Sequence, residues 1–272
     1  MNVIEELTSK NRVLIMGILN VTPDSFSDGG EYNDADLARE RGIAMVNQGA
    51  DIIDVGGEST RPGAGEVPPE EEMARTIPVI EEIRERSDVL ISIDTRKASV
   101  AERALDAGAD IVNDVSALRS DPELGELVAE RGVPIVLMHM QGTPESMQEN
   151  PTYDDPVGDI IDFLRERTAA AVDYGITREK IIIDPGIGFG KTVAHNYEIL
   201  RRLEEFQVLG SPLLLGTSRK SFIGATLDLP VDERIEGTIA SNVIGLLKGA
   251  KILRVHDVKE VFRATRVAMR CR

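Results

Sequence analysis

The sequence predicts one (β/α)8 barrel of the TIM type, a single domain over residues 1–272. Eight short apolar runs rich in Val, Ile and Leu recur along the chain, and longer stretches with apolar residues at helical spacing separate them. No linker or shift in composition divides the chain. Alternating strands and helices imply a parallel sheet, and eight such units suit a closed barrel better than an open sheet. The alternative is a doubly wound sheet, whose Gly-x-Gly-x-x-Gly fingerprint after the first strand is absent.

The apolar runs are expected to be strands buried on both faces. None of them alternates apolar with polar residues for long, which is typical of parallel strands covered on both sides. The expected strands are 12–19, 51–55, 89–93, 110–112, 134–138, 180–183, 212–215 and 251–255.

The stretches between these runs are expected to be helices that cover the barrel. They begin with acids and prolines, such as Pro69 and Pro122, and several end in a glycine directly before the next strand. Gly49, Gly108, Gly132 and Gly249 are the glycines expected to end helices in this way. The expected helices are 34–49, 69–86, 97–107, 122–131, 155–175, 194–206, 232–248 and 257–270.

Polar residues follow every expected strand, although the strands themselves are apolar. Chemistry in this fold occurs at the carboxyl ends of the strands, and buried Asp or Asn side chains cost free energy unless they find partners. For Asp94, Asn113 and Asp184 we therefore expect ligand binding, and their acceptors and donors suit the edge of a flat heterocycle. For three further residues we favour capping of the following helix. These residues are Asp114, Ser116 and Asp257.

Cations also gather after the strands, and the loop 216–224 combines them with glycines at a helix start. Backbone N–H groups and cations at a helix start form an anion site, although pairing with local acids would also explain single arginines. The cations are Arg61, Arg219, Lys220, Arg254 and His256. Two long loops, 20–33 and 56–68, are expected to act as lids, and Phe26 either covers an aromatic ligand or pins the first loop.

The formal net charge of −16 argues against a nucleic-acid footprint or an anionic membrane partner. A salt-rich habitat and a plain acidic surface explain the acid excess equally well. Cys271 is the single cysteine, no run approaches the length of a membrane span, and the first residues do not read as a signal peptide. We therefore expect a cytoplasmic protein.

Seven motifs together resemble the dihydropteroate synthase family, in that family's order and over nearly the whole chain. They are MGILNVTPDSFSDGG (16–30), GADIIDVGGESTRPGA (49–64), SIDTRK (92–97), NDVSA (113–117), DPGIGFGK (184–191), GTSRKSFIG (216–224) and RVHDV (254–258). The resemblance implies a pterin-binding TIM barrel that works as a homodimer in folate biosynthesis and is a sulfonamide target. Such a transferase condenses p-aminobenzoate with (7,8-dihydropterin-6-yl)methyl diphosphate, with Mg2+, and releases 7,8-dihydropteroate and diphosphate.

The resemblance also assigns residues to each substrate. For the pterin and its diphosphate it implies Asn20, Asp94, Asn113, Met138, Asp184, Gly216, Lys220, Arg254 and His256. For p-aminobenzoate it implies Thr60, Arg61, Pro62, Phe189, Lys220 and Ser221, with Ser218 nearby. Asn20 is the implied Mg2+ ligand, and Asp94, Asp184, Lys220 and Arg254 are the implied catalytic residues.

A dissociative substitution is the expected mechanism, because loss of diphosphate leaves a cation that the pterin can delocalise. Asp94 and Asp184 would stabilise that cation, while Mg2+, Arg61, Arg254 and His256 would neutralise the leaving group. The alternatives are a methyltetrahydrofolate-dependent methyltransferase, a non-catalytic pterin-binding paralogue and a phosphate-binding barrel aldolase. His139 is expected to be structural, and His195 to be a solvated surface residue.

Overall fold

Eight parallel strands form the centre of the computed structural model, which describes residues 12–22, 30–59, 65–143 and 146–271. The strands pair in the order β6-β5-β4-β3-β2-β1-β8-β7. The ring closes through a parallel bridge between Ile183 and Leu213, where the Ile183 N–H donates to the Pro212 carbonyl at 3.0 Å. The strands are β1 (Leu14–Asn20), β2 (Ile52–Gly56), β3 (Leu90–Asp94), β4 (Ile111–Asp114), β5 (Ile135–Met138), β6 (Ile181–Asp184), β7 (Leu214–Leu215) and β8 (Ile252–Val255). The predicted barrel is confirmed.

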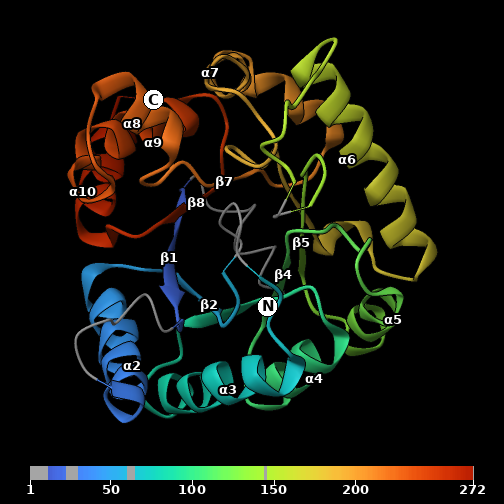
Figure 1. Ribbon diagram of the computed structural model, residues 1–272, viewed down its shortest axis with the longest axis vertical. Helices are drawn as coiled ribbons and strands as arrows, with labels where there is room; N and C mark the ends of the chain where they lie inside the picture. The colour runs from blue at the N-terminus through green and yellow to red at the C-terminus, as the bar shows by residue number, and fades with distance from the viewer. Residues whose placement is uncertain (1–11, 23–29, 60–64, 144–145, 272) are drawn as a thin grey trace.

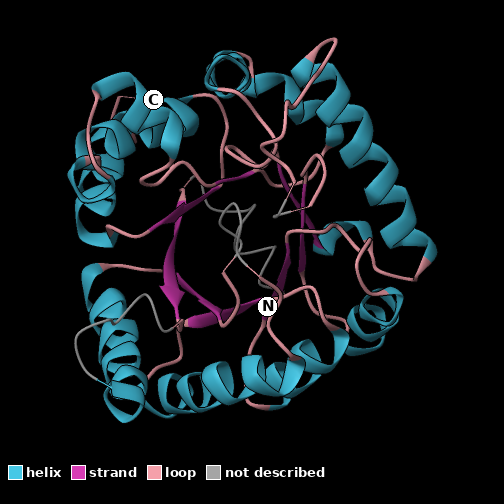
Figure 2. Ribbon diagram, viewed as in Figure 1, coloured by secondary structure: helices cyan, strands magenta, loops and turns pink. Residues whose placement is uncertain are grey.

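Helices surround this ring of strands on the outside (Figures 1 and 2). They are α2 (Gly30–Gln48), α3 (Pro69–Arg86), α4 (Ala98–Asp106), α5 (Pro122–Arg131), α6 (Pro156–Asp173), α7 (Val193–Arg201), α8 (Ser221–Leu227), α9 (Ile235–Leu247) and α10 (Val258–Ala268). Three short 3-10 helices join them: η2 (Arg178–Lys180), η3 (Leu203–Leu209) and η4 (Val231–Glu233). No helix of the described part of the chain is long and apolar enough to cross a membrane.

The expected glycine ends of the helices are present. Gly49, Gly108 and Gly249 have φ values of 106°, 109° and 106°, and Gly132 ends α5 in the left-handed region at 61°. This conformation lets the last helical carbonyls be satisfied and turns the chain directly into the next strand. The beginning of α5 was also expected, since Pro122 follows Asp121, whose side chain accepts from the Glu123 N–H.

Three helical expectations were wrong in detail. The stretch 194–206 divides into α7 and η3, because Leu203, Phe206 and Leu209 are buried at intervals of three residues, the period of a 3-10 helix. A helix start was expected at the loop 216–224 but no helix was given bounds there; α8 begins at Ser221, and its apolar face consists of Phe222 and Ile223. The loop expected over 20–33 is shorter, since α2 begins at Gly30.

Two apolar cores lie on the two faces of the strands. One fills the barrel and takes residues from all eight strands: Leu14, Met16, Ile52, Leu90, Ile111, Val136, Ile182, Leu214 and Ile252. The other packs between the strands and the helices, and it includes Ile53, Val55, Ile93 and Leu253. Side chains alternate along a strand, so neighbouring residues enter different cores. Both faces are therefore apolar, which explains the near-continuous apolar runs.

Gly186, directly after β6, is a position where a side chain should not fit. Its φ is 66°, and an added Cβ would lie 1.9 Å from the His139 carbonyl oxygen. Gly210 has a similar φ of 72° but nothing within 4 Å of an added Cβ. We expect Gly186→Ala to lower the free energy of unfolding by about 3 kcal/mol or more, because it adds a clash to the backbone strain. Gly210→Ala is the matched control, and it should cost about 1 kcal/mol from strain alone.

Urea denaturation of the two variants measures both changes. Equal losses in the two variants would contradict the predicted clash at Gly186.

Candidate active site

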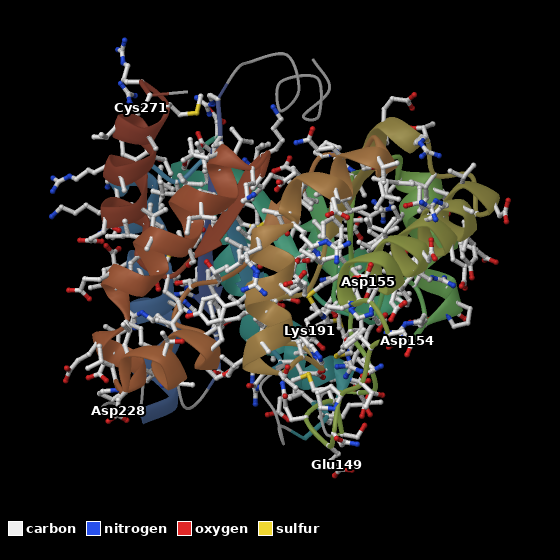
Figure 3. All side chains as sticks on the ribbon, turned by 90° about the horizontal axis from the view of Figure 1, so that it is seen from above. Glu149, Asp154, Asp155, Lys191, Asp228 and Cys271 are labelled. Atoms are coloured by element: carbon white, nitrogen blue, oxygen red, sulfur yellow. The ribbon has the colours of Figure 1, made fainter. Side chains whose placement is uncertain are left out.

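The alternation that fills the barrel also builds its mouth. On each strand, the residue two positions after the inner apolar layer also faces the barrel interior, and it lies one layer nearer the carboxyl end of the barrel. The residues at these positions are Ile18, Asp54, Ser92, Asn113, Met138, Asp184, Gly216 and Arg254. Asn20 and Asp94 stand two residues further on β1 and β3. In Figure 3, Glu149 after β5 and Asp228 after α8 lie at the lower end of the molecule, opposite Cys271. Most of the predicted pterin residues therefore belong to one layer.

Arg254 is held between two carboxylates at the centre of this layer. Its Nε donates to Oδ2 of Asp54 at 2.6 Å, and its Nη2 donates to Oδ2 of Asp94 at 2.6 Å. Oδ2 of Asp54 also accepts from Nδ2 of Asn113 at 3.1 Å. The side chain of Asp54 is fully buried and that of Arg254 is 20% exposed. The structure thus joins Arg254 and Asn113 through Asp54, which had no predicted role, and joins Asp94 to them through Arg254.

Burial and charge act against each other in this cluster. Burial raises the pKa of Asp94 to about 7; the charge of Arg254 opposes the rise and that of Asp54 adds to it. Burial also lowers the pKa of Arg254, but the carboxylates of Asp54 and Asp94 more than compensate and the pKa lies above its usual value. Arg254 therefore stays cationic while Asp94 titrates near neutral pH.

On the opposite side of the mouth, Asp184 and Lys220 influence each other through their charges. Burial raises the pKa of Asp184, against the charge of Lys220 and the hydrogen bond that Oδ1 accepts from the Gly186 N–H at 2.7 Å. Burial lowers the pKa of Lys220 to about 8, although Asp184 opposes the change. Nζ of Lys220 donates to the Ile187 carbonyl and lies 4.4 Å from the centre of the Phe189 ring.

An apolar wall completes this side. Met138 is buried in a cluster with Val115, Met140 and Met147, and Phe189 packs against that cluster. Sulfur and aromatic groups beside carboxylates suit a flat ring with a polar edge. The sequence reasoning placed Met138 and Phe189 with different substrates, and here both line one continuous surface with Lys220.

The ends of β7 and β8 are tied together by Ser218 and His256. Oγ of Ser218 lies 3.1 Å from the His256 backbone nitrogen and 3.0 Å from its Nδ1. Next to them, the Arg219 guanidinium donates to both oxygens of Asp257, at 2.9 and 2.5 Å. Arg219 is therefore paired with an acid, which was the alternative to a role in anion binding.

None of the three residues that were expected to cap the following helix does so. Asp257 stands at the start of α10 but makes no capping hydrogen bond, because Arg219 takes its carboxylate. Asp114 accepts from the Ser116 N–H and hydroxyl and from the Leu118 N–H, so the pair closes a tight turn. The helix that follows, α5, is capped by Asp121 instead.

The remaining predicted residues are placed as follows. Asn20 ends β1, in register with Gly56. Gly216 is buried after β7, and Ser221 is exposed as the first residue of α8. Four residues lie outside the described part of the chain: Phe26, Thr60, Arg61 and Pro62.

The described ends of the loop 56–68 are joined by Glu58. Its carboxylate accepts from the Val67 N–H at 3.1 Å, from Nη2 of Arg96 at 2.5 Å and from Nζ of Lys97 at 2.5 Å. These contacts lower the pKa of Glu58 despite its burial. A cavity of about 460 Å³ lies beside this cluster, and Arg96, Lys97 and Asp121 contribute to its lining. Sequence reasoning missed Glu58, because its partners come from distant parts of the chain.

The two other histidines have structural contacts. His139 is buried, with Nδ1 2.9 Å from Nζ of Lys191 and its ring edge-on to Phe163, in line with the structural role expected. Burial lowers the pKa of His139 to about 2. His195 is half-buried and forms a capping box with Thr192 at the start of α7, so the expectation of a solvated residue was wrong.

Comparison with known proteins agrees with the motifs. The model of the family described as pterin binding enzyme matches residues 16–256. The dihydropteroate synthase of Escherichia coli K12 is 52% identical over 253 residues, covering 93% of this chain and 89% of that protein.

The chain belongs to the dihydropteroate synthase family of pterin binding enzymes.

Solved structures of this family are also similar to this chain. Yersinia pestis dihydropteroate synthase, solved as a sulfonamide drug complex, gives a TM-score of 0.92 at 47% identity, with 96% of this chain and 94% of that one covered. The Xanthomonas albilineans enzyme with 4-aminobenzoic acid gives a TM-score of 0.91 at 44% identity, with 96% and 93% covered. A second structure of that enzyme contains 7,8-dihydropteroate and gives a TM-score of 0.88 at 41% identity, with 96% and 94% covered.

The opposed pKa shifts predict a bell-shaped pH profile for dihydropteroate synthase activity. With pterin substrate limiting, kcat/KM reports groups of the free enzyme. Activity should rise as Asp94 loses its proton near pH 7, because a carboxylate would stabilise the cation that the expected dissociative path forms. It should fall as Lys220 loses its proton near pH 8, because a cation is lost. Lys220→Arg should extend the plateau to higher pH, since an arginine keeps its charge.

The acid limb of the Lys220→Arg profile serves as the internal control and should stay near pH 7. A basic limb that remains at the same pH in this variant would contradict the assignment to Lys220.

Proposed function

We propose that this protein is a dihydropteroate synthase of folate biosynthesis. It condenses p-aminobenzoate with (7,8-dihydropterin-6-yl)methyl diphosphate to give 7,8-dihydropteroate and diphosphate. The observation that carries the proposal is the layer of buried polar side chains at the barrel mouth, in a chain about half identical to dihydropteroate synthases along its length. Asp94, Asn113 and Asp184 are 8%, 4% and 6% exposed there.

These three residues suit the hydrogen-bonding edge of the pterin. Carboxylates accept N–H groups and a carboxamide both donates and accepts, so together they match alternating donors and acceptors on a heterocycle. Met138 supports one face of the ring, and Gly216 leaves space, since an added Cβ there would approach only the Cβ of Arg254, at 3.9 Å.

The chain's own charges support a dissociative path. As the bond to diphosphate breaks, Asp94 and Asp184 face the pterin cation, while Arg254 faces the leaving group and Lys220 faces the p-aminobenzoate carboxylate. A guanidinium has five N–H donors, and the two carboxylates engage only part of them. His256, held by Ser218, and Asn20 complete the diphosphate site in this proposal. The arylamine is itself a competent nucleophile, so no catalytic triad is assigned.

Asn20 fits a role as the protein ligand of Mg2+. Asn20 is the last residue of β1, and its side-chain amide carries an oxygen. Mg2+ prefers oxygen ligands, and it often takes only one or two of them from the protein beside substrate phosphates and water. Among the described residues, no group of three or more His, Cys, Asp and Glu could hold a metal ion. A single amide oxygen from the protein fits a cation that would also bind the diphosphate of the substrate. Such a cation would neutralise charge on the leaving group.

A direct assay tests the reaction. The purified protein, supplied with 7,8-dihydropterin diphosphate, p-aminobenzoate and Mg2+, should release diphosphate and dihydropteroate in equal amounts, and EDTA should abolish turnover. Arg254→Ala should slow turnover at least tenfold, about 1.4 kcal/mol of transition-state stabilisation. Pterin binding without product would favour the non-catalytic paralogue, and methyl transfer from methyltetrahydrofolate would favour the methyltransferase. Full turnover in EDTA would refute the metal role.

We also propose a homodimer formed through α7, α8 and α9, which lie next to each other on one side of the barrel (Figure 1). Large apolar side chains are exposed on these helices and on the 3-10 helices between them. They are Val193, Val208, Leu227, Val231, Ile244 and Leu247. Single exposed apolar residues are ordinary, whereas a group on neighbouring elements is typical of an interface.

Light scattering of charged variants tests this interface. Val208 is 70% and Leu247 52% exposed, so Val208→Glu combined with Leu247→Glu should give a monomer without unfolding the barrel. Leu37→Glu is the matched control, since Leu37 is 48% exposed on α2 and the dimer should persist. A dimer in both variants would refute the proposed face.

The setting we propose is the cytoplasm, where the one cysteine, the exposed Cys271, remains a thiol. We further propose that sulfonamides compete for the p-aminobenzoate half of the site. The sulfonamide complex of the Yersinia pestis enzyme supports this second proposal.

A further inference from the structure

Asp54 carries a buried carboxylate to which the proposed reaction gives no task. It is an inward-facing residue of β2, and its side chain is fully buried. Its Oδ2 accepts from Arg254 at 2.6 Å and from Asn113 at 3.1 Å. Its Oδ1 is buried and has no hydrogen-bond partner among the described residues. A carboxylate in this environment therefore has half of its hydrogen-bonding capacity unused.

Stability alone does not explain an aspartate at this position. Taking a carboxylate out of water is costly, and replacing a buried ion pair with apolar residues is often neutral or stabilising. The inward-facing residue one layer below it on β2 is Ile52, which is fully buried in the apolar interior. A polar group that is costly for folding, and that touches two site residues, indicates a functional constraint.

The contact with Arg254 fixes the plane of the guanidinium. Asp54 binds it at Nε and Asp94 binds it at Nη2, so two points on different nitrogens remove rotation about the side chain. A free arginine side chain carries about 2 kcal/mol of rotamer entropy, which would otherwise be lost when a phosphate binds. With both carboxylates in place, that ordering is complete before substrate arrives.

The contact with Asn113 fixes the direction of its carboxamide. Nδ2 donates to Asp54, so the amide oxygen must point away from β2. The orientation of an amide follows from its hydrogen-bond network. An ionised aspartate can only accept hydrogen bonds, so the amide must turn its NH2 group toward it. The carboxylate of Asp54 thus fixes the orientation of both the Arg254 guanidinium and the Asn113 amide oxygen at the mouth.

We propose that Asp54 is a positioning residue of the pterin site, which holds Arg254 and Asn113 in the orientations that meet the dihydropterin diphosphate. The inference rests on the proposed function, because it concerns the binding of that substrate. Asp54 acts through the two neighbours that it orients.

The matched pair Asp54→Asn and Asp110→Asn tests the proposal. Asp110 precedes β4 at the other end of the barrel, and its carboxylate likewise accepts from an arginine, Arg84, at 2.6 Å. Asp54→Asn should weaken the binding of dihydropterin diphosphate about ten- to a hundredfold, the range of one to two charge-assisted hydrogen bonds. Calorimetry measures that affinity.

The effect should be confined to one substrate. With saturating pterin, the KM for p-aminobenzoate should change by less than about twofold in Asp54→Asn, because the altered contacts lie in the pterin half. Asp110→Asn should leave both constants unchanged while lowering the thermal midpoint. Equal pterin affinity in wild type and a folded Asp54→Asn, or equal losses for both substrates, would overturn the inference.

A double-mutant cycle separates positioning from general damage. In an Arg254→Ala background, Asp54→Asn should cause a clearly smaller further loss of pterin affinity, because the main group that it orients is gone. Additive losses would overturn the role assigned through Arg254.

The unmodified protein provides a readout if the variant fails to fold. The Arg254 Nε–H signal in nitrogen-15 NMR, assigned by its absence in Arg254→Lys, should exchange slowly with water because Asp54 holds it. Exchange as fast as that of an exposed arginine would overturn the inference. A wild-type protein that makes no dihydropteroate would instead refute the proposed function, so the two failures are distinguishable.

Discussion

The guanidinium of Arg254 lies between two buried carboxylates, and the arrangement of the mouth depends on that contact. Without Arg254, Asp94 would lose the positive charge that opposes the rise of its pKa, and the charge of Asp54 would remain to raise it further. Without the carboxylates, a mostly buried cation would have no charge partner at this point. The Arg254 guanidinium stabilises the ionised form of Asp94, and the two carboxylates stabilise the guanidinium, so a cation and an anion lie side by side at the mouth.

This cluster exists because a closed barrel has two kinds of inward-facing layer. The lower layer is apolar and seals the interior, while the layer two residues above it is open to a ligand and takes polar groups. The cost of burying Asp54, Asn113 and Asp184 is borne by the apolar layers, which stabilise the fold without them. Position on the strand therefore decides whether a residue serves stability or binding.

Sequence periodicity was sufficient for the barrel and for most of the mouth. All eight strands lie within two residues of their expected bounds, because strands buried on both faces leave a continuous apolar signal. Asp94, Asn113 and Asp184 were found because each directly follows an apolar run, where polar residues are conspicuous. Asp54 was overlooked because it lies inside a strand; counting two residues on from Ile52 would have placed it in the mouth.

Other features depend on contacts between distant residues, which periodicity does not contain. Arg219 and Asp257 were both predicted from their local neighbours, one as an anion ligand and one as a cap, whereas they bind each other across 38 positions. Glu58 joins the two ends of its own loop to Arg96 and Lys97, which follow β3, in the same way. The division of 194–206 into two helices has a local cause, the three-residue spacing of Leu203, Phe206 and Leu209, and a closer reading of the sequence would have found it.

The net charge of −16 does not prevent anionic substrates from binding, because the surface acids and the cations of the mouth act over different distances. Exposed acids on the outer helices, such as Glu40, Glu166 and Glu205, face water and salt, which screen charges beyond about 8 Å at physiological ionic strength. Arg254 and Lys220 act at contact distance from a poorly hydrated layer, where screening is weak. The last 28 residues carry eight Lys or Arg and only two Asp or Glu, so the strand that supplies Arg254 also lies in the cationic part of the chain. The surface charge therefore governs solubility, and the mouth governs which anions bind.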